Sequence, residues 1–171
     1  MTGALRSRAM SAIEVTRVGT PEEMAHALRI RTCVFVDEQH VPLELEVDAY
    51  DGDPSTHERA GVLHVLARFD GVPVGTARLL LEPGEGETHE AGALAHIGRV
   101  AVLIKHRRAG IGAALMRALH DEAHRRGFGG IAISAQLHAV PFYEGLGYLA
   151  DGPIYLEAGG CPLHYPLTRP F

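Results

Sequence analysis

Residues 107–112 read Arg-Arg-Ala-Gly-Ile-Gly, and the interpretation of the whole chain starts from this stretch. It follows the apolar run 100–104 and begins an amphipathic helical pattern that ends at Gly127. Glycines let the backbone approach a ligand closely, and the first turn of a helix presents unpaired N–H groups to an anion. With Lys105 just before it, the stretch is basic in a chain of net charge −5. It predicts a phosphate-binding turn, and a plain helix start with glycines in the preceding turn is the alternative.

The spacing of the glycines narrows the choice of phosphate ligand. A Walker loop requires G-x-x-x-x-G-K-[ST], and a dinucleotide fold requires G-x-G-x-x-G after its first strand. Residues 107–112 match neither motif. The ligand is therefore expected to be a phosphorylated molecule of another class.

The composition is that of an ordinary globular protein. The chain has 171 residues, 46% hydrophobic and 22% charged, so we expect one domain over 1–171 with 1–11 disordered. No apolar run approaches the ~20 residues of a membrane span and the N-terminus lacks a signal-peptide core, which predicts a cytoplasmic protein without membrane contact. Net acidity argues against nucleic-acid binding. Cys33 and Cys161 are expected to be free thiols, with a disulfide between them as the alternative.

Periodicity and turn residues predict a mixture of strands and helices. The expected elements, in chain order, are a strand at 13–18, a helix from Thr20 to about Val36, a long loop at 37–55 with room for one helical turn, strands at 61–69 and 72–81, a mobile excursion at 82–93, a strand at 97–104, a helix ending at Gly127, a strand at 131–135, a short helix at 139–146, and strands at 154–156 and 163–167. Thr20 with Glu23 forms a capping box, and Asp70-Gly71 is a strong hairpin signal. Because a helix connects 97–104 to 131–135, these two strands are expected to be parallel.

Three segments in this order resemble the GNAT superfamily of acyl-CoA-dependent N-acyltransferases. The first is 99–112, with Arg99-Val-Ala-Val followed by Arg107-x-x-Gly-x-Gly. The second is 135–148, Ala-Gln-Leu-His-Ala-Val-Pro-Phe-Tyr-Glu-Gly-Leu-Gly-Tyr. The third, 34–42 with Glu44, Glu46 and Asp48 beyond it, is similar to a small bacterial single-domain subgroup. The resemblance implies an α/β (α+β) fold with a central mixed, mostly antiparallel sheet of six to seven strands, about four helices and a splayed parallel strand pair.

Two departures from the family pattern affect the end of the chain and the second segment. Where the subgroup has E-A-G-I-P-H, residues 157–164 read Glu-Ala-Gly-Gly-Cys-Pro-Leu-His, which leaves the register of the last strand and any role of His164 open. Gln136 stands where many members have Asn, so the amide is kept with a longer reach.

The resemblance implies acetyl-CoA as cosubstrate, lying between the splayed strands. The implied acyl-CoA-binding residues are Val100, Ala101, Val102, Arg107, Arg108, Ala109, Gly110, Ile111, Gly112, Gln136 and Phe142. The tyrosine of the second segment, Tyr143, is implied to point its hydroxyl at the CoA sulfur and to assist departure of the thiol. The alternative is a tyrosine that only packs on a short helix.

The acceptor side is less defined by the sequence. Attack on a thioester needs a neutral amine, so a base is valuable, and Glu38, Glu44, Asp48 and His96 are candidates, with Glu38 preferred. The residues expected to bind the acceptor are Phe35, Gln39, Arg78 and His96. Arg31, Arg78 and Arg99 interrupt apolar segments and are expected to pair with acids of the 37–53 loop or to lie at sheet edges, with a substrate carboxylate as the second role.

A metal site is not expected. His120 and His124 have the i, i+4 spacing of zinc ligands, but the motif is not H-E-x-x-H and both are expected on the outward face of their helix. The sequence thus predicts an N-acetyltransferase acting on a primary amine of a small molecule or peptide. A noncatalytic acyl-CoA sensor or protein-interaction module is the alternative. Formation of a homodimer and the identity of the amine stay open.

Overall fold

A computed structural model describes residues 12–81, 92–156 and 163–171. Three parts of the sequence discussed above lie outside the described residues: the N-terminal 1–11, most of the expected excursion at 82–93, and Cys161. Cys33 is an exposed free thiol. The helices are α1 (Pro21–Arg31), α2 (Leu43–Glu46), α3 (Ile111–Arg125) and α4 (Val140–Glu144). The strands are β1 (Ile13–Arg17), β2 (Val62–Phe69), β3 (Val72–Leu80), β4 (Leu94–Val102), β5 (Gly130–Gln136), β6 (Leu149–Ala150), β7 (Tyr155–Leu156) and β8 (Leu163–Pro170).

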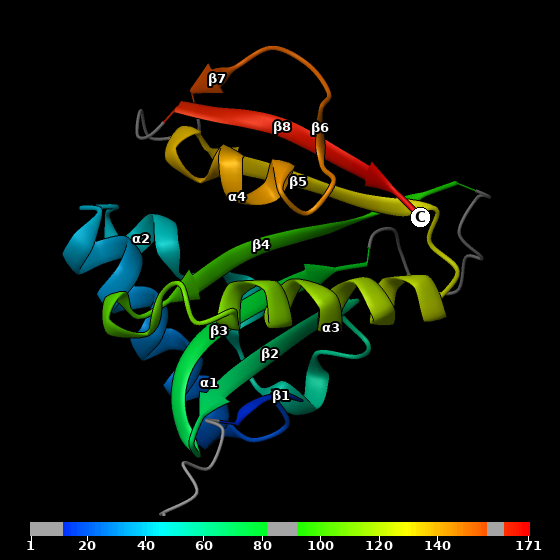
Figure 1. The fold of residues 1–171 in the computed structure, drawn as a ribbon. Helices are drawn as coiled ribbons and strands as arrows, with labels where there is room; N and C mark the ends of the chain where they lie inside the picture. Colours follow the sequence, from blue (N-terminus) through cyan, green and yellow to red (C-terminus); the bar gives the residue numbers. More distant parts are fainter. Residues whose placement is uncertain (1–11, 82–91, 157–162) are drawn as a thin grey trace, which may run out of the picture.

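The described strands form one mixed sheet (Figure 1). Their order is β1-β2-β3-β4-β5-β8-β6, and β7 also pairs with β8. All neighbours are antiparallel except β4 and β5, which are parallel as expected from the helix between them. The sheet has eight strands instead of six to seven, because the two-residue strands β6 and β7 add to the strands with readable patterns.

Local sequence signals explain the N-terminal half of the sheet. The Thr20 hydroxyl accepts a hydrogen bond from the Glu23 N–H (3.2 Å), and the Glu23 carboxylate accepts from the Gly19 N–H (2.9 Å), so the helix start is capped on both sides. Asp70 and Gly71 have φ of +50° and +82° and form the tight turn between β2 and β3. A two-residue turn of this kind matches the right-handed twist of paired strands.

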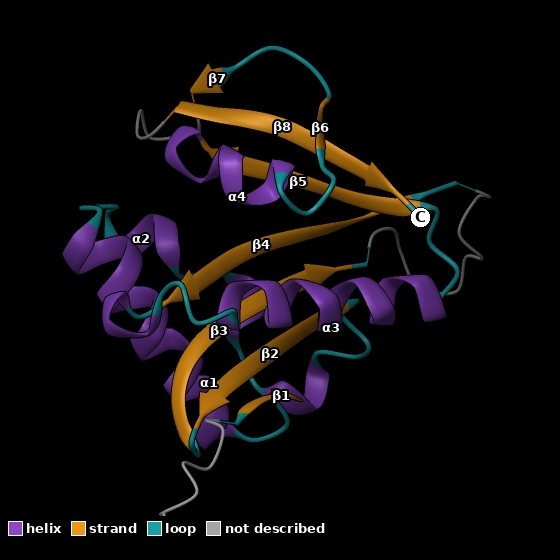
Figure 2. Cartoon of the chain, in the orientation of Figure 1, coloured by secondary structure: helices purple, strands orange, loops and turns teal. Residues whose placement is uncertain are grey.

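Helices cover the two faces of the sheet (Figure 2). Ile111, Leu115, Met116 and Leu119 of α3 and Tyr143 of α4 pack on one face. Met24, Ala27 and Ile30 of α1 pack on the other face, against Leu66 of β2 and Ala101 of β4. The alternation of side chains along a strand lets β2 and β4 contribute to both cores.

Three of the differences from the sequence expectation concern β4 and the segments that follow α1. Strand β4 starts at Leu94 and ends at Val102, earlier than the predicted 97–104, and the last predicted residue, Ile104, begins a 3₁₀ turn. After α1 the chain continues as a π-helix, Thr32–Glu38, instead of ending near Val36. The 37–55 loop contains α2 and short 3₁₀ turns at Ala49–Asp51 and Pro54–Thr56, more helical turns than the single one expected.

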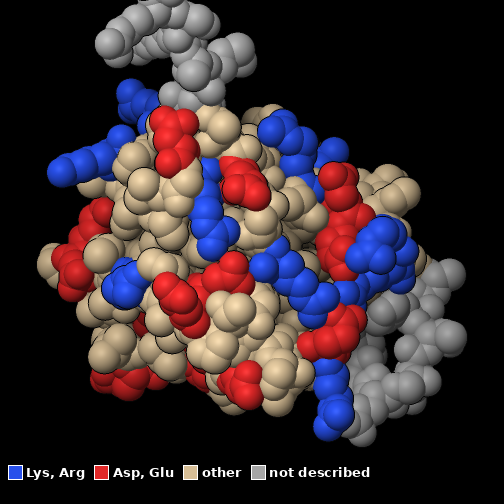
Figure 3. All heavy atoms as spheres, turned by 90° about the horizontal axis from the view of Figure 1, so that it is seen from below, with Lys and Arg blue, Asp and Glu red and all other residues tan. Residues whose placement is uncertain are grey.

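The described surface carries both signs of charge. On the face in Figure 3, lysine and arginine side chains are interspersed with aspartate and glutamate. Within the described ranges, no helix is both long enough and apolar enough to cross a membrane.

Candidate active site

The parallel strands β4 and β5 separate partway along their length (Figure 1). They are paired from Leu94 opposite Gly130 to Ile97 opposite Ile133, and not beyond. Strand β5 is paired with β8 along its whole length, from Gly130 opposite Pro170 to Gln136 opposite His164. The splayed pair expected from the family resemblance is therefore present. Its diverging ends leave backbone groups that a ligand can pair with, since buried N–H and C=O groups require partners.

A β-bulge shapes the diverging part of β4. Thr76 of β3 pairs with Ala101 and Arg78 pairs with Gly98, so Arg99 and Val100 together lie opposite one residue of β3. Arg99 has a φ of +53°, which is uncommon for a residue with a side chain. Bulges of this kind bend a strand and redirect a side chain, often beside a functional site.

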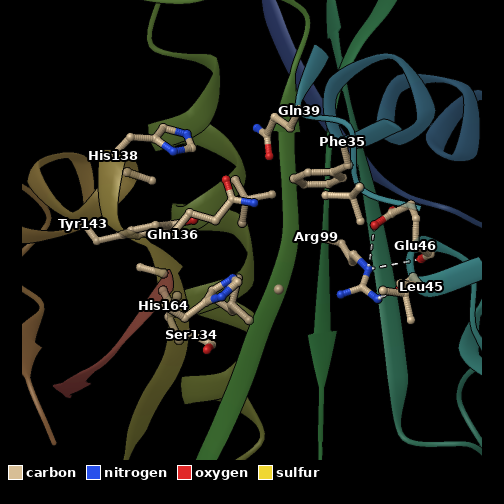
Figure 4. A pocket seen from close by; sticks show the side chains of 17 residues that line it. Phe35, Gln39, Leu45, Glu46, Arg99, Ser134, Gln136, His138, Tyr143 and His164 are labelled. Carbon is tan, nitrogen blue, oxygen red and sulfur yellow. Dashed lines mark hydrogen bonds and ion pairs between the residues drawn. The ribbon is translucent and has the colours of Figure 1, made fainter. Parts of the chain in front are cut away.

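A cavity of about 380 Å³ lies between the diverging strands and the segment after α1. Such a volume is in the range of small-molecule sites. Five residues predicted for the site line it: Phe35, Gln39, Val100, Gln136 and Tyr143. In Figure 4, Phe35, Gln39, Arg99 and Glu46 lie on one side, and Gln136, His138, Tyr143 and His164 on the other.

The predicted phosphate-binding turn has the expected backbone. It begins after a 3₁₀ turn at Ile104–His106, and Gly110, in the left-handed region with φ of +84°, precedes the first residue of α3. The Ala114 N–H donates to Gly110 O (3.0 Å), and no side chain of the described residues caps the N-terminus of the helix. The preceding N–H groups are available to an anion.

Gly112 has a packing role. A Cβ at this position would lie 3.1 Å from Cζ of Phe142 and 3.3 Å from its Cε2. The Phe142 ring thus connects the start of α3 to α4, where Tyr143 lies. Neither Phe142 nor the 107–112 turn lines the cavity itself.

The Arg107 side chain is already engaged by the protein. Its guanidinium donates to both carboxylate oxygens of Glu38 (2.7 Å each) and, through Nε, to Val102 O (2.9 Å). The hydrogen bond from Arg107 lowers the pKa of Glu38, and Glu38 does not line the cavity. A carboxylate with a lowered pKa is a poor proton acceptor, so these positions argue against Glu38 as the general base.

Tyr143 is 7% exposed, and its ring lies between those of Phe142 and Tyr148, with centroids 5.0 and 5.9 Å away. In Figure 4 its side chain extends from α4 towards the cavity. Burial raises the pKa of Tyr143 to about 12, so the phenol stays protonated at neutral pH. It is placed to donate a hydrogen bond to a group bound in the cavity.

The acceptor side contains a carboxylate that sequence reasoning did not single out as a base. Glu46, on α2, is 4% exposed and lines the cavity. Burial raises the pKa of Glu46, although hydrogen bonding to Arg31 and the nearby Arg99 oppose this effect. Its place in the motif after residue 42 was visible, but nothing in the spacing showed that it would turn inward while Glu44 is exposed.

The three arginines in apolar segments pair with acids of the 37–53 loop, which confirms the first of their expected roles. Arg31 is 1% exposed and bonds both oxygens of Asp51 (2.5 and 2.9 Å) and Glu46. Arg78 donates to both oxygens of Asp48 (2.8 Å each). These contacts hold the loop that carries α2 against the sheet.

Two residues predicted to bind the acceptor are placed elsewhere. Arg78 is buried beside Asp48 and does not line the cavity, because its guanidinium is used to hold the loop. His96 is exposed and precedes the splay, opposite Leu80 of β3, so it also lies outside the cavity. Among the other base candidates, Asp48 is paired with Arg78, and Glu44 does not line the cavity.

The expected outward position of His120 is wrong. His120 is 8% exposed, with Nε2 bonded to the Tyr148 hydroxyl (2.5 Å) and Nδ1 accepting from Arg169 (2.6 Å). The helical pattern placed it outside, but the C-terminal strand β8 covers that side of α3. His124 is exposed, and the described residues contain no group of three or more metal-binding side chains.

A protein family, curated sequences and solved structures are similar to this chain. The model of the acetyltransferase (GNAT) family matches residues 25–148. The uncharacterized N-acetyltransferase YjcF of Bacillus subtilis is 33% identical over 139 residues, covering 81% of this chain and 87% of that protein. The structure of an acyl-CoA N-acyltransferase from Pseudomonas aeruginosa has 30% identity and a TM-score of 0.68, with 94% of this chain and 99% of that one covered.

An aminoglycoside 6'-N-acetyltransferase solved with coenzyme A shares the fold at a TM-score of 0.66. Its sequence identity is 15%, with 93% of this chain and 97% of that chain covered, so the likeness concerns the fold alone.

Proposed function

The chain belongs to the GNAT acetyltransferase family, and we propose that it transfers an acetyl group from acetyl-CoA to a primary amine by direct attack in a ternary complex. The observation that carries this proposal is the cavity at the point where β4 and β5 separate, with Tyr143 reaching it from α4. The transferase class comes from the family, and the acceptor and the roles of individual residues are part of the proposal.

Acetyl-CoA binding is assigned to the backbone more than to side chains. The N–H groups at the start of α3, from Arg108 to Gly112, hold the pyrophosphate, supported by the partial positive charge of the helix end. The pantetheine arm pairs with the backbone of β4 near Val100 and Val102, on the side that β5 has left. Gln136 and Phe142 border this path from β5 and α4. The Arg107 side chain contributes once it exchanges Glu38 for phosphate.

The acceptor approaches from the side of Phe35 and Gln39. An ordinary alkyl ammonium with a pKa near 10.4 costs about 5 kcal/mol to deprotonate at pH 7, so an acceptor for its proton matters. We assign that proton to Glu46, directly or through water, because Glu46 is the carboxylate that lines the cavity among the described residues. Its burial favours the protonated form.

Tyr143 serves the leaving group. With a phenol pKa of about 12 and a thiol near 8.5, proton transfer to a fully formed thiolate is unfavourable by about 5 kcal/mol. An ordinary phenol would face about 2 kcal/mol. The Tyr143 hydroxyl therefore acts by hydrogen bonding while the C–S bond breaks, and proton donation accompanies that step.

The test is release of CoA from acetyl-CoA in the presence of amines, with the acetylated product identified by mass spectrometry. Amino acids, amino sugars, polyamines and peptides are tried separately, and acetyl-CoA binding is measured by calorimetry. Turnover with formation of an N-acetyl product is the expected result. Tight binding of acetyl-CoA with no product from any amine would replace the enzyme by a noncatalytic acyl-CoA sensor.

A further inference from the structure

Arg99 presents a guanidinium that is fixed along one edge and open along the other. Its Nε lies 3.2 Å from a carboxylate oxygen of Glu46 and 3.3 Å from Glu46 O, and its Nη2 donates to Leu45 O (3.2 Å). Nη2 also lies 3.5 Å from Asp48. For Nη1, the part of the chain that the structure describes offers no hydrogen-bond acceptor, and Arg99 lines the cavity (Figure 4).

The backbone is distorted where it places this side chain. Arg99 has a positive φ, +53°, inside the β-bulge that begins after Gly98. A residue other than glycine is strained in this region and persists where the surroundings require it. The distortion turns Arg99 towards the cavity and towards α2. Arg78, on the neighbouring strand, instead donates its hydrogen bonds to Asp48. A guanidinium held in this way keeps Nη1 for a carboxylate, which can bind it in a charge-assisted hydrogen bond.

Gln39 gives independent evidence that a ligand supplies a hydrogen-bond donor in this cavity. Its Oε1 atom is buried and has no hydrogen-bond donor among the described residues. Gln39 lines the same cavity from the segment after α1, and in Figure 4 its amide is directed towards the space between Phe35 and Gln136. Buried acceptors of this kind are normally satisfied, so the bound state should provide an N–H.

We propose that the acceptor is a small amino acid-like molecule, an amine that carries its own carboxylate. The carboxylate binds the open edge of Arg99, and an N–H of the acceptor binds Gln39 Oε1. The cavity of about 380 Å³ must also admit the acetyl thioester, which leaves room for a small molecule. This inference rests on the proposed function and narrows its substrate class.

The reaction balances without further reagents. The neutral amine nitrogen attacks the thioester carbonyl, a C–N bond forms, and the C–S bond breaks. The nitrogen loses one proton, which passes through Glu46 to solvent. The CoA sulfur gains one proton from the Tyr143 hydroxyl, and the tyrosine recovers a proton from solvent. The carboxylate bound to Arg99 does not react, so Arg99 is a specificity residue and its loss should raise KM more than it lowers kcat.

The first experiment needs only the wild-type protein and matched acceptors. Each amino acid, for example L-leucine, is compared with its amide, L-leucinamide, and its decarboxylated amine, isopentylamine. Side chains of every class are included, together with β- and γ-amino acids and polyamines. The expected result is a kcat/KM at least about tenfold higher for the carboxylate member of a productive set, since hydrogen bonds to charged groups contribute strongly. Equal or better turnover of amides, amines or polyamines would overturn the inference while leaving the acetyltransferase intact.

The second experiment uses Arg99→Gln with Arg78→Gln as its matched control. Both arginines contact Asp48, but only Arg99 lines the cavity. Arg99→Gln should abolish the preference for the carboxylate over the amide, with acetyl-CoA affinity unchanged. Arg78→Gln should keep the preference even if it destabilises the loop. Preservation of the ratio in Arg99→Gln would overturn the assignment, and absence of product with every amine would overturn the proposed function itself.

Discussion

Tyr143 combines burial with access to the cavity, which determines how its hydroxyl can act. The ring is packed between two aromatic neighbours, and burial raises its pKa to about 12. A protonated donor in a dry environment forms a stronger hydrogen bond to a developing negative charge than it would in water. Its contribution should therefore appear in the chemical step and not in cosubstrate binding.

Tyr143→Phe is expected to lower kcat by about 10²-fold, the usual size of a proton-donor contribution. The affinity for acetyl-CoA should stay within about twofold, because the ring is retained and the lost interaction is made in the transition state. Steady-state kinetics and calorimetry measure the two quantities. Tyr165→Phe, on β8 and outside the cavity lining, is the matched control and should leave kcat unchanged. An unaltered kcat in Tyr143→Phe would remove this residue from the mechanism.

At the scale of elements, periodicity and turn residues predicted the structural features that depend on residues close together in the sequence. The Thr20 cap, the Asp70-Gly71 hairpin and the parallel β4 and β5 follow from local patterns and are present. The π-helix and the bulge at Arg99 were not predicted, because each depends on packing between segments distant in the sequence. The bulge is where Arg99 lines the cavity, whereas His96 lies outside the cavity because it precedes the splay.

The Glu38–Arg107 ion pair joins the segment after α1 to the turn before α3. Glu38 occupies the guanidinium that we propose for the pyrophosphate, and Glu38 does not line the cavity. Glu38→Gln should thus change kcat by less than about threefold, whereas loss of a general base costs about 10²–10⁴-fold. Acetyl-CoA should bind at least as tightly, because the competing carboxylate is gone.

Glu44→Gln, an exposed change on α2, is the control for these measurements. Arg107→Gln should change the affinity for acetyl-CoA in the opposite direction. It should weaken acetyl-CoA binding and reduce its dependence on salt, since one cation that faces the phosphates is lost. A large fall in kcat for Glu38→Gln, with a shift of the acidic limb of the pH–rate profile, would restore Glu38 as the base.

At the scale of the whole molecule, the sequence did not reveal the inward or outward direction of some side chains in and around the candidate site. Glu46 and Glu44 are two residues apart on a single helical turn, yet only Glu46 faces the cavity. His120 belongs to the polar side of a helical pattern, yet β8 covers it. In both cases burial depends on a distant segment that closes over the element, and periodicity reports only on the element itself.

The same distant packing predicts how stability depends on pH. Burial lowers the pKa of His64 and of His120 to about 4, against an ordinary value of 6.5. Above pH 6.5 both forms of the protein carry neutral imidazoles. As the pH falls from 6.5 to 4, these two histidines bind protons in the unfolded chain but stay largely neutral in the folded protein. The free energy of unfolding therefore decreases.

Each histidine should lower the free energy of unfolding by about 2 kcal/mol between pH 7.5 and pH 5, and by about 3 kcal/mol between pH 7.5 and pH 4. Urea unfolding at several pH values measures the decrease. His64 is 1% exposed and its Nε2 is 2.9 Å from Tyr50 O, so His64→Gln can keep a donor there while removing the titration. It should reduce the loss between pH 7.5 and 5 by about 2 kcal/mol, whatever its effect on stability at pH 7.5. His124→Gln, an exposed change on α3, is measured beside it as the control for a histidine-to-glutamine substitution. An identical slope in wild type and His64→Gln would show that His64 titrates normally in the folded protein.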